Sequence, residues 1–453
     1  MTNTKKILFG FSVFLLASHS WANTPNDMLI WTKDGNIETF DINDVDSITF
    51  SENKLSEPKL YNDWIYPPVL SAPNILRMSY DDLVTVHENN NFANKCFEKL
   101  CQDTTKNIIF SPISLNMALG LCANATTDEG VKELSNLLGF SKSNQPLKEI
   151  NEFYNKIILS LNSPIDSVIF HLANAAWIDN ALQIDEDFYN TAAKDYYATI
   201  RNLDFANYPN RAKDTINKWA ALMTNDCIKE LNINITKQTT AVINNACYFK
   251  GKWVTSFTKL PDSCGFSTPD SGTIMIDMMS QKNTLGYAKT DDYQAVKVDY
   301  GNPKETKASI NNQGAYSMIF LLPNEDKSLK SVLPSVQWDS ITFENNYMEL
   351  TLPSYKFYSS LDLTQILLSL GLNQYYNTPK LGGFINQIKQ DSYINVFEGG
   401  TEAAAVTSFV IFRGVDPEPQ IKLNFNRPFA FAIRENNSGL IIFMGKVEHP
   451  SNK

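Results

Sequence analysis

The stretch that most constrains the fold of this chain lies near its C-terminus, at residues 396–414, and reads VFEGGTEAAAVTSFVIFRG. Its three consecutive alanines favour helix. The β-branched residues from Val406 to Ile411 favour strand instead. A segment with both preferences can be structured differently in two states of one molecule. Residues 416–419 (DPEP) carry two prolines that interrupt regular structure, so we predict an exposed, cleavable loop that is able to become a strand.

The length and net charge of the chain limit the classes of protein to which it can belong. The chain has 453 residues, 43% of them hydrophobic, a net charge of −10 and a pI near 5.1. This is enough chain for one large domain or two smaller ones. The acidic balance argues against nucleic acid as a partner, because binding would work against phosphate repulsion. No basic cluster indicates a heparin site, and we interpret Lys213 and Lys218 as a solvated helix face.

The N-terminus has the features of a processing signal. Lys5 and Lys6 precede an apolar run at residues 7–17, and the small residue Ala22 follows. The run is short for a transmembrane helix. We therefore expect a signal peptide at 1–22, cleaved after Ala22, and an exported protein that is secreted, periplasmic or held at the cell surface. No cysteine follows the signal, so no lipid anchor is expected there.

The six cysteines do not resemble a disulfide framework or a metal site. They are sparse, and Cys122 and Cys247 lie inside apolar runs, where cysteine behaves as a small hydrophobe. There is no CxxC and no Cys/His set with zinc spacing. We expect free, buried thiols, and neither a metal nor a cofactor. The six are Cys96, Cys101, Cys122, Cys227, Cys247 and Cys264.

Two short segments precede the main domain. Residues 28–50 alternate apolar and polar on both sides of Asp34-Gly35, which predicts a β-hairpin within 23–50. This segment resembles the β segment found after the signal peptide of exported Bacteroidetes proteins. Residues 51–78 contain four prolines and no sustained period, so they are interpreted as a linker. The main domain is expected at 79–453.

The main domain is expected to be α+β. Helix signals come mainly early and strand signals mainly late, which favours helices beside a largely antiparallel sheet. Ser111 is placed to cap a helix that has Pro112 at its first position. Helices are expected at 91–100, after 112, and at 128–138, 147–161, 186–196, 211–231 and 361–370. Strands are expected at 167–178, 239–250, 273–279, 293–300, 315–322, 346–352, 391–397, 421–425, 429–434 and 440–447.

Six pieces of sequence, in order and at characteristic spacing, resemble the serpin family over about residues 79–450. They are NIIFSPIS at 107–114, INKW at 216–219 with TNDCI at 224–228, NACYFKGKW at 245–253, MIFLLPN at 318–324, EGGTEAAAVT at 398–407, and FNRPF at 425–429 with FMGKV at 443–447.

The resemblance implies a large central, mostly antiparallel sheet, smaller sheets, about eight to nine helices and an exposed reactive-centre loop. It implies an inhibitor and not an enzyme. A target endopeptidase, serine or also cysteine type, cleaves the loop and forms an acyl-enzyme. Residues 400–413 then insert into the central sheet and hold the protease in a covalent 1:1 complex with a monomeric inhibitor.

The loop sequence is compatible with insertion. Counting from Thr401, alternate side chains up to Ile411 would face the sheet interior, and none of them is charged. Glu402 would face solvent, and two glycines supply the freedom that a hinge needs. The alternative is a non-inhibitory serpin with a fixed loop, acting as a surface or binding protein. The hinge residues are Glu398, Gly399, Gly400, Thr401, Glu402, Ala403, Ala404 and Ala405.

The bond that is cleaved is open to more than one interpretation. Counting from Glu398 as in inhibitory family members puts Gly414 before the bond. Arg413 fits an acidic primary pocket better, through charge-assisted bonds. We expect cleavage between Arg413 and Gly414 by a trypsin-like protease, with Phe412 and Ile411 as alternatives for apolar pockets.

The resemblance also implies where the sheet must open. It puts Ser111, Ser114, Asn245 and Gln390 in a polar cluster beneath the central strands, and Trp253 where the loop first enters. The family commonly has histidine at position 390. Glutamine can still donate and accept, but pH dependence through that histidine is lost.

The alternative interpretation is that the chain is an enzyme, and the sequence contains no catalytic motif that supports it. Only four histidines are present, and there is no G-x-S-x-G, H-E-x-x-H, P-loop or G-x-G-x-x-G.

Overall fold

The computed structural model describes residues 27–31, 37–41, 78–102, 104–162, 168–301, 315–385, 387–401 and 418–451. The chain divides into two units, Met1–Glu57 and Pro58–Lys453. In the first unit β1 (Asp27–Trp31) pairs antiparallel with β2 (Ile37–Asp41), in a register symmetric about position 34. The expected signal peptide at 1–22, nearly all of the 51–78 linker and loop residues 402–417 lie outside the described residues.

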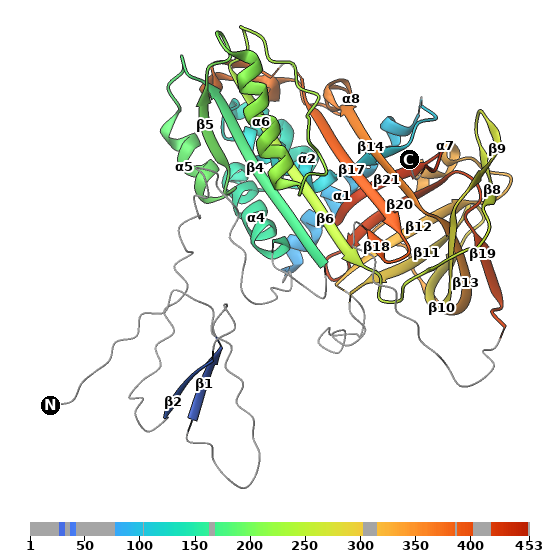
Figure 1. Ribbon diagram of the computed structural model, residues 1–453. Helices are drawn as coiled ribbons and strands as arrows, with labels where there is room; N and C mark the ends of the chain where they lie inside the picture. Colours follow the sequence, from blue (N-terminus) through green and yellow to red (C-terminus); the bar gives the residue numbers. More distant parts are fainter. Residues whose placement is uncertain are drawn as a thin grey trace. The chain divides into compact units, whose positions relative to one another are not determined.

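A six-stranded sheet is the centre of the larger unit (Figure 1). Neighbouring strands are antiparallel, apart from the parallel pair at one edge formed by β4 and β5. In spatial order the strands are β14 (Tyr355–Asp362), β17 (Lys389–Phe397), β18 (Gly400–Thr401), β6 (Ala241–Lys252), β4 (Val168–Asp179) and β5 (Thr199–Leu203).

A second sheet has nine strands and runs beside the first. It runs continuously from β19 to β3. Its strands, in order, are β19 (Ile421–Asn424), β13 (Glu344–Pro353), β10 (Met278–Lys289), β11 (Tyr293–Tyr300), β12 (Tyr316–Pro323), β20 (Phe429–Glu435), β21 (Ile441–Val447) and β3 (Ile108–Phe110), with β7 (Thr258–Lys259) pairing to β10. Two small hairpins are β8 (Cys264–Thr268) with β9 (Gly272–Ile276), and β15 (Asn377–Thr378) with β16 (Gly383–Phe384).

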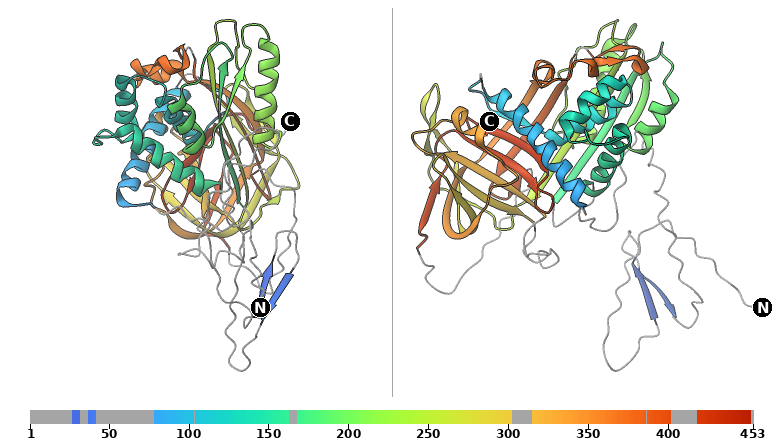
Figure 2. Two further views of the ribbon diagram at one scale, coloured as in Figure 1. Left: turned by 90° about the vertical axis from the view of Figure 1, so that its left-hand side faces the viewer. Right: turned by 180° about the vertical axis from the view of Figure 1, so that it is seen from behind.

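The described residues contain eight α-helices, and these cover both faces of the six-stranded sheet. In the left view of Figure 2, light-green α6 lies on one side of the sheet and the blue and teal helices lie on the other. Trp219 of α6 packs edge-on against Trp177 of β4, with ring centroids 6.0 Å apart. The helices are α1 (Tyr80–Cys101), α2 (Pro112–Ala123), α3 (Asp128–Leu138), α4 (Pro146–Leu161), α5 (Glu186–Lys194), α6 (Pro209–Met223), α7 (Leu329–Val332) and α8 (Thr364–Ser369).

The α+β prediction and most elements are confirmed, but two helices differ clearly from the expected length. The helix expected at 91–100 is α1 and begins at Tyr80. The helix expected at 211–231 ends at Met223, because Asn225 and Asp226 adopt φ of 51° and 62°. Left-handed backbone of this kind ends a helix. Several strands were not expected, namely β5, β7, β8, β14, β15, β16 and the part of β10 after residue 279. All six cysteines are free thiols, and Cys96, Cys101 and Cys122 are buried.

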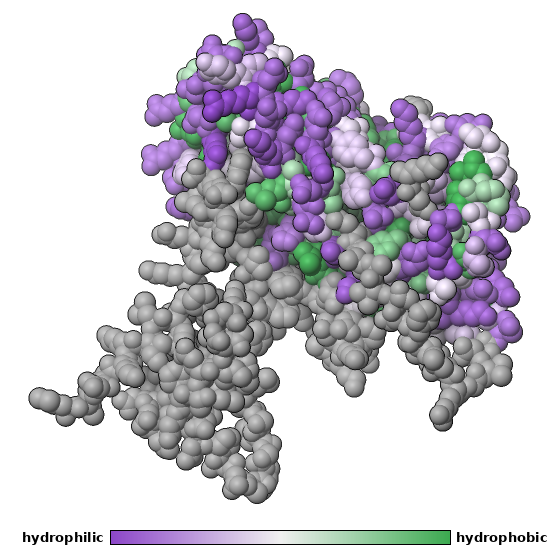
Figure 3. All heavy atoms as spheres, viewed as in Figure 1, coloured by the Kyte–Doolittle hydropathy of each residue, from purple (hydrophilic) through white to green (hydrophobic). Residues whose placement is uncertain are grey.

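Burial follows the sequence pattern. Helix α2 is buried over almost its whole length, and Ser111 caps it through the backbone N–H of Ser114. On the face shown in Figure 3 the described surface is mostly hydrophilic, with hydrophobic residues scattered over it. No helix among the described residues is long and apolar enough to span a bilayer.

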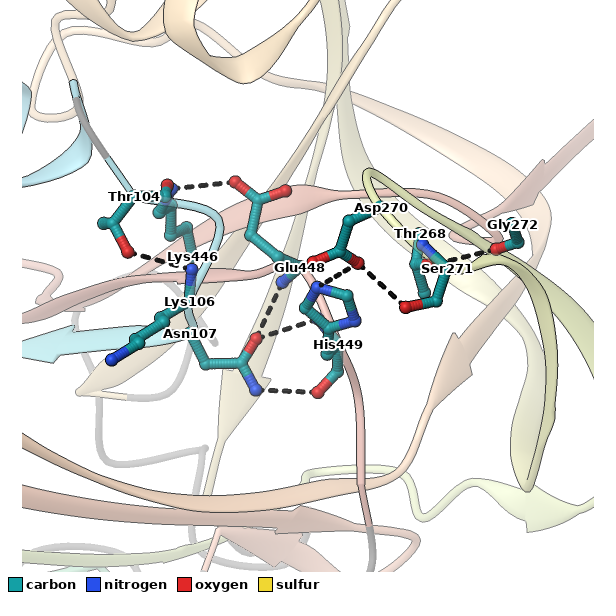
Figure 4. A network of polar contacts seen from close by, with 10 residues as sticks. All are labelled: Thr104, Lys106, Asn107, Thr268, Asp270, Ser271, Gly272, Lys446, Glu448 and His449. Carbon is teal, nitrogen blue, oxygen red and sulfur yellow. Dashed lines mark hydrogen bonds and ion pairs between the residues drawn. The ribbon is translucent and has the colours of Figure 1, made fainter.

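The C-terminal strand is tied to β3 through a polar network (Figure 4). The side-chain amide of Asn107 accepts from the backbone N–H groups of Glu448 and His449 at 2.8 and 2.9 Å. It also donates to the carbonyl of His449 at 2.7 Å. Beside it, the buried Lys446 ammonium lies 2.8 Å from the Glu448 carboxylate and also donates to the carbonyl of Thr104. His449 in turn pairs with Asp270 in the β8–β9 turn.

We predict that Asn107→Ala lowers the free energy of unfolding by about 2–4 kcal/mol, because three backbone groups lose their partner at once. Denaturant unfolding followed by circular dichroism measures this change. The control is Asn346→Ala, since that partly exposed side chain donates to the nearby carbonyl of Glu344 at the start of its own strand. Equal effects of the two substitutions would contradict the role of the network.

Candidate functional site

The predicted hinge begins a strand inside the six-stranded sheet. Strand β18 consists of Gly400 and Thr401 and lies between the parallel strands β17 and β6, antiparallel to both. Thr401 is opposite Val396 on one side and Gly251 on the other. The first two residues of a central strand are therefore already in register.

Thr401 faces the interior of the molecule, as the alternation of the loop sequence predicts. Its side chain is 3% exposed, and its Oγ1 hydrogen-bonds the Tyr300 hydroxyl at 2.6 Å. Burial raises the pKa of Tyr300 far above its ordinary value, so the phenol stays neutral. Thr401 thus sets which face of a continuing strand is buried.

Close backbone approach explains why position 400 is glycine. Gly400 has a φ of 151°, and a Cβ there would lie 2.1 Å from the carbonyl oxygen of Gly251. An atom at that distance from backbone cannot be accommodated without moving a strand. Gly399 is less constrained, since its Cβ would meet only the Phe397 ring edge at 3.0 Å.

Trp253 holds the turn that leads into β18. Its ring stacks on Tyr300 with centroids 4.3 Å apart, and its indole N–H donates to the carbonyl of Phe397 at 3.0 Å. Its backbone N–H donates to the carbonyl of Gly399, and that of Phe257 donates to the carbonyl of Glu398. Residues 398–401 are fixed from both sides by these contacts.

Beyond Thr401, a gap separates β6 from β17. Among the described residues these two strands are neighbours only through β18, which occupies just the last two positions of each pairing edge. A pocket lies between them, and we call it the lane. It is lined by Cys247, Tyr248 and Phe249 of β6, Tyr393 and Ile394 of β17, Thr401, the core residues Ile109, Ile433 and Phe443, and Thr224, Cys227 and Ile228.

The segment after α6, residues 224–233, crosses the lane. Its Asn232 backbone N–H donates to the Asp391 carboxylate of β17 at 3.1 Å, and the Asn232 side chain donates to Ser360 of β14. The Tyr358 hydroxyl donates to the same carboxylate. At the other side, the N–H of Leu231 donates to Asn217 of α6 at 3.0 Å. No local sequence pattern predicts this crossing, because it depends on residues far apart in the chain.

Gln390 and Ser111 join β17 to the start of α2. The side-chain amide of Gln390 donates to the carbonyl of Ser111 and accepts from its N–H, both at 2.8 Å. The Ser111 hydroxyl donates to the carbonyl of Ile442 and lies 3.6 Å from the thiol of Cys247 on β6. Ser111 therefore contacts both strands that border the lane. Burial raises the pKa of the Cys247 thiol to about 12, so the thiol is neutral.

The other two residues expected in this cluster do not bond to Gln390. Asn245 donates to Asn174 of β4 at 2.7 Å, and its buried Oδ1 has no partner among the described residues. Ser114 is buried and contributes its backbone N–H to the Ser111 hydroxyl. The expected cluster is thus two pairs, Ser111 with Gln390 and Asn174 with Asn245.

The cleavage-site residues and the rest of the hinge are outside the described part of the chain and stay predictions. They are Ile411, Phe412, Arg413 and Gly414, with Glu402, Ala403, Ala404 and Ala405.

We predict that Gly400→Ala expels β18 from the sheet, because the new methyl group would collide with the Gly251 carbonyl. Amide hydrogen exchange at Thr401 and Trp253 should accelerate, and the folded state should lose about 1–3 kcal/mol. Gly399→Ala is the matched control and should leave exchange at Thr401 nearly unchanged. Slow exchange at Thr401 in Gly400→Ala would refute this account of position 400.

Comparison with known proteins agrees with this architecture. A serpin-like protein of Methanosarcina acetivorans is 30% identical over 392 residues, covering 82% of this chain and 89% of its own. Among solved structures, the thermophilic serpin tengpin in its native state has a TM-score of 0.71 at 22% identity, covering 82% of this chain and 95% of its own. Human thyroxine-binding globulin has a TM-score of 0.70 at 23% identity, covering 82% of this chain and 100% of its own. The family model for serpins, described as serine protease inhibitors, matches residues 87–450, and the chain therefore belongs to the serpin family.

Proposed function

We propose that this serpin is an inhibitory one, which traps trypsin-like serine endopeptidases by loop cleavage and insertion. The observation that carries the proposal is β18. Two hinge residues already pair with both β6 and β17, and the lane continues from them along the same strand edges.

Continuing the β18 register gives each loop residue a defined pair of neighbours. The successive positions would pair Glu402 with Asn395 and Lys250, Ala403 with Ile394 and Phe249, Ala405 with Ser392 and Cys247, and Thr407 with Gln390 and Asn245.

The chemistry at these positions is compatible with that register. Ala403 and Ala405 would face the interior, where small side chains fit over the packed core beneath the lane. Thr407 would bring a hydroxyl beside the Asn245 Oδ1 that has no partner among the described residues, and a donor there removes the cost of an unsatisfied buried acceptor. Glu402 would lie on the outer face next to Lys250, an opposite-charge pair across strands.

Insertion would also supply the free energy that the mechanism needs. A strand of about a dozen residues forms ladder bonds on both edges, each with a net contribution of about 0.5–1.5 kcal/mol. A release on the order of 10 kcal/mol is enough to distort a bound active site, provided that the starting fold is kinetically trapped.

The covalent step would use the ordinary chemistry of the protease. Its serine Oγ bonds to the carbonyl carbon of Arg413, and the peptide bond to the nitrogen of Gly414 breaks. The protease histidine passes the serine proton to the departing amine. Insertion before water attacks the ester leaves the two proteins joined.

We predict that mixing the protein with trypsin gives an SDS-stable band at the summed mass, and that Thr401→Arg abolishes it while loop cleavage continues. Position 401 faces the buried side of the strand, where an unpaired charge is costly. The matched control, Glu402→Arg, adds the same side chain on the outer face and should still give the complex. Cleavage alone by trypsin, chymotrypsin, elastase and a papain-like enzyme would instead identify a non-inhibitory serpin.

The choice of bond is tested separately. Arg413→Gln should remove the trypsin complex, because the acidic primary pocket loses its ion-pair partner. Arg413→Lys keeps the charge and should retain it. Mass spectrometry of the released C-terminal peptide identifies the bond, and a trypsin complex that persists in Arg413→Gln would assign cleavage to another residue such as Phe412 or Ile411.

A further inference from the structure

The segment after α6 is fixed to that helix at several points. We call this segment, residues 224–233, the strap. The Thr224 hydroxyl donates to a carbonyl in the last turn of α6 at 2.7 Å and accepts from the backbone N–H of Ile228 at 3.0 Å. The backbone N–H of Leu231 donates to the side chain of Asn217 on α6. Ile228 and Leu231 are also buried in the apolar cluster that α6 forms with β4 and β6. The strap therefore belongs with the half of the sheet that contains β6.

On the other side of the lane, the strap contacts β17 and β14. The backbone N–H of Asn232 donates to one oxygen of the Asp391 carboxylate at 3.1 Å, and the Tyr358 hydroxyl donates to the other oxygen. The Asn232 side chain donates to Ser360 at 3.2 Å, and Ser360 lies directly opposite Asp391 in the pairing of β14 with β17. Tyr393 of β17 packs against the apolar cluster. Asp391 thus gives the strap a charged anchor on the half of the sheet that contains β17.

The groups around this contact leave the Asp391 carboxylate as its acceptor. Glu230 of the strap pairs with Lys213 of α6 at 2.9 Å. Partial burial, the hydrogen bond to Asp391 and the nearby Glu230 charge raise the pKa of Tyr358, so its hydroxyl keeps the proton that it donates. A hydrogen bond to a charged group is stronger than one between neutral groups. Among the polar contacts of Asn232 given above, the one to Asp391 is therefore expected to contribute most.

The register of β18 places this contact beside the path of a growing strand. Thr401 pairs with Val396, so the residue five positions later, Val406, would lie beside Asp391. Side chains in a strand alternate between faces, and Val406 would therefore point to the outer face, where the strap lies. Three strap residues also line the lane, namely Thr224, Cys227 and Ile228. A strand that extends from β18 would meet the strap before it passed Asp391.

We propose that Asp391 is a positioning residue that holds the strap across the lane and limits how often the lane opens. The consequence for function, a control on the rate of loop insertion, rests on the inhibitory function proposed above. Releasing Asn232 from Asp391 leaves the strap attached to α6, so the strap lifts without unfolding. Because the contact has to be broken before a strand passes, it contributes to the barrier to insertion.

Amide hydrogen exchange of the uncleaved protein, read by mass spectrometry on peptides that span 224–233, tests the anchor. Asp391→Ala removes the acceptor, and exchange in the strap should become about tenfold faster. Asp391→Asn keeps an oxygen acceptor and should restore most of the protection. The matched control is Asp362→Ala on β14, whose carboxylate accepts from the backbone N–H of Thr364 and from Gln387. This control should leave exchange in the strap unchanged.

Labelling of Cys247 by iodoacetamide, also read by mass spectrometry, tests the opening of the lane. The Cys247 thiol lines the lane, and burial raises its pKa to about 12, so its labelling reports an opening. The labelling rate should rise about three- to tenfold in Asp391→Ala and stay unchanged in Asp362→Ala. Cys122, which is buried in α2, is the internal reference and should not react faster. A general loss of stability would accelerate both thiols.

Two outcomes would overturn the proposal. Exchange in the strap could be the same in Asp391→Ala as in the unaltered chain, or Cys247 and Cys122 could be accelerated equally. Ser360→Ala, which removes only the acceptor of the Asn232 side chain, is a milder second variant and should change exchange and labelling in the same direction.

The test also separates this proposal from the proposed function. Faster labelling of Cys247 alone supports the role of Asp391 even if the unaltered chain does not trap trypsin, a result that would refute only the inhibitory function. Where trypsin is trapped, Asp391→Ala should form the complex at least as fast as the unaltered chain.

Discussion

Gly400 and Thr401 form a two-residue strand that lies between β6 and β17 and pairs with both. The rest of the site depends on this pairing. The backbone edges that face the lane have strand partners only at their last two positions among the described residues. Buried peptide groups without hydrogen-bond partners raise the free energy of the folded state. An additional strand between β6 and β17 would supply those partners. In the proposed inhibitory mechanism, the state with the loop inserted would therefore be lower in free energy than the state with the loop outside the sheet.

In the proposed mechanism, two contacts around the lane would have to change before a strand could insert. Gln390 attaches β17 to the start of α2, and the Asn232–Asp391 bond holds the segment after α6 across the front. Neither contact joins β6 to β17 directly. The Gln390 contact lies on the β17 side of the lane, and the Asn232 contact lies across its face. Each is made of a few hydrogen bonds to backbone, so each can be exchanged for others as strands move. In the proposed mechanism these contacts would therefore act as a local kinetic barrier.

Sequence patterns predicted what depends on neighbours in the chain. The ends of α3 agree with the expected 128–138, because Thr127 caps the helix and Gly139 ends it in a left-handed conformation. The inward direction of Thr401 followed from period-two alternation. The division of the polar cluster did not follow, because Asn245 bonds Asn174 across a strand pair that no local pattern specifies. The crossing by Asn232 was missed for the same reason, because tertiary partners decide it. The early end of α6 was missed because it depends on the left-handed backbone of Asn225 and Asp226.

The short length of β18 has a consequence for how a longer strand would grow. Because side chains in a strand alternate between faces, a slip of one residue would turn Glu402 toward the core and Ala403 toward solvent. The pairing of Thr401 already determines which residues of a longer strand would face the core. The close approach of Gly400 to the Gly251 carbonyl prevents this register from shifting. Growth of the strand then needs no search for alignment and resembles propagation from an existing nucleus, which is the fast part of any cooperative ordering.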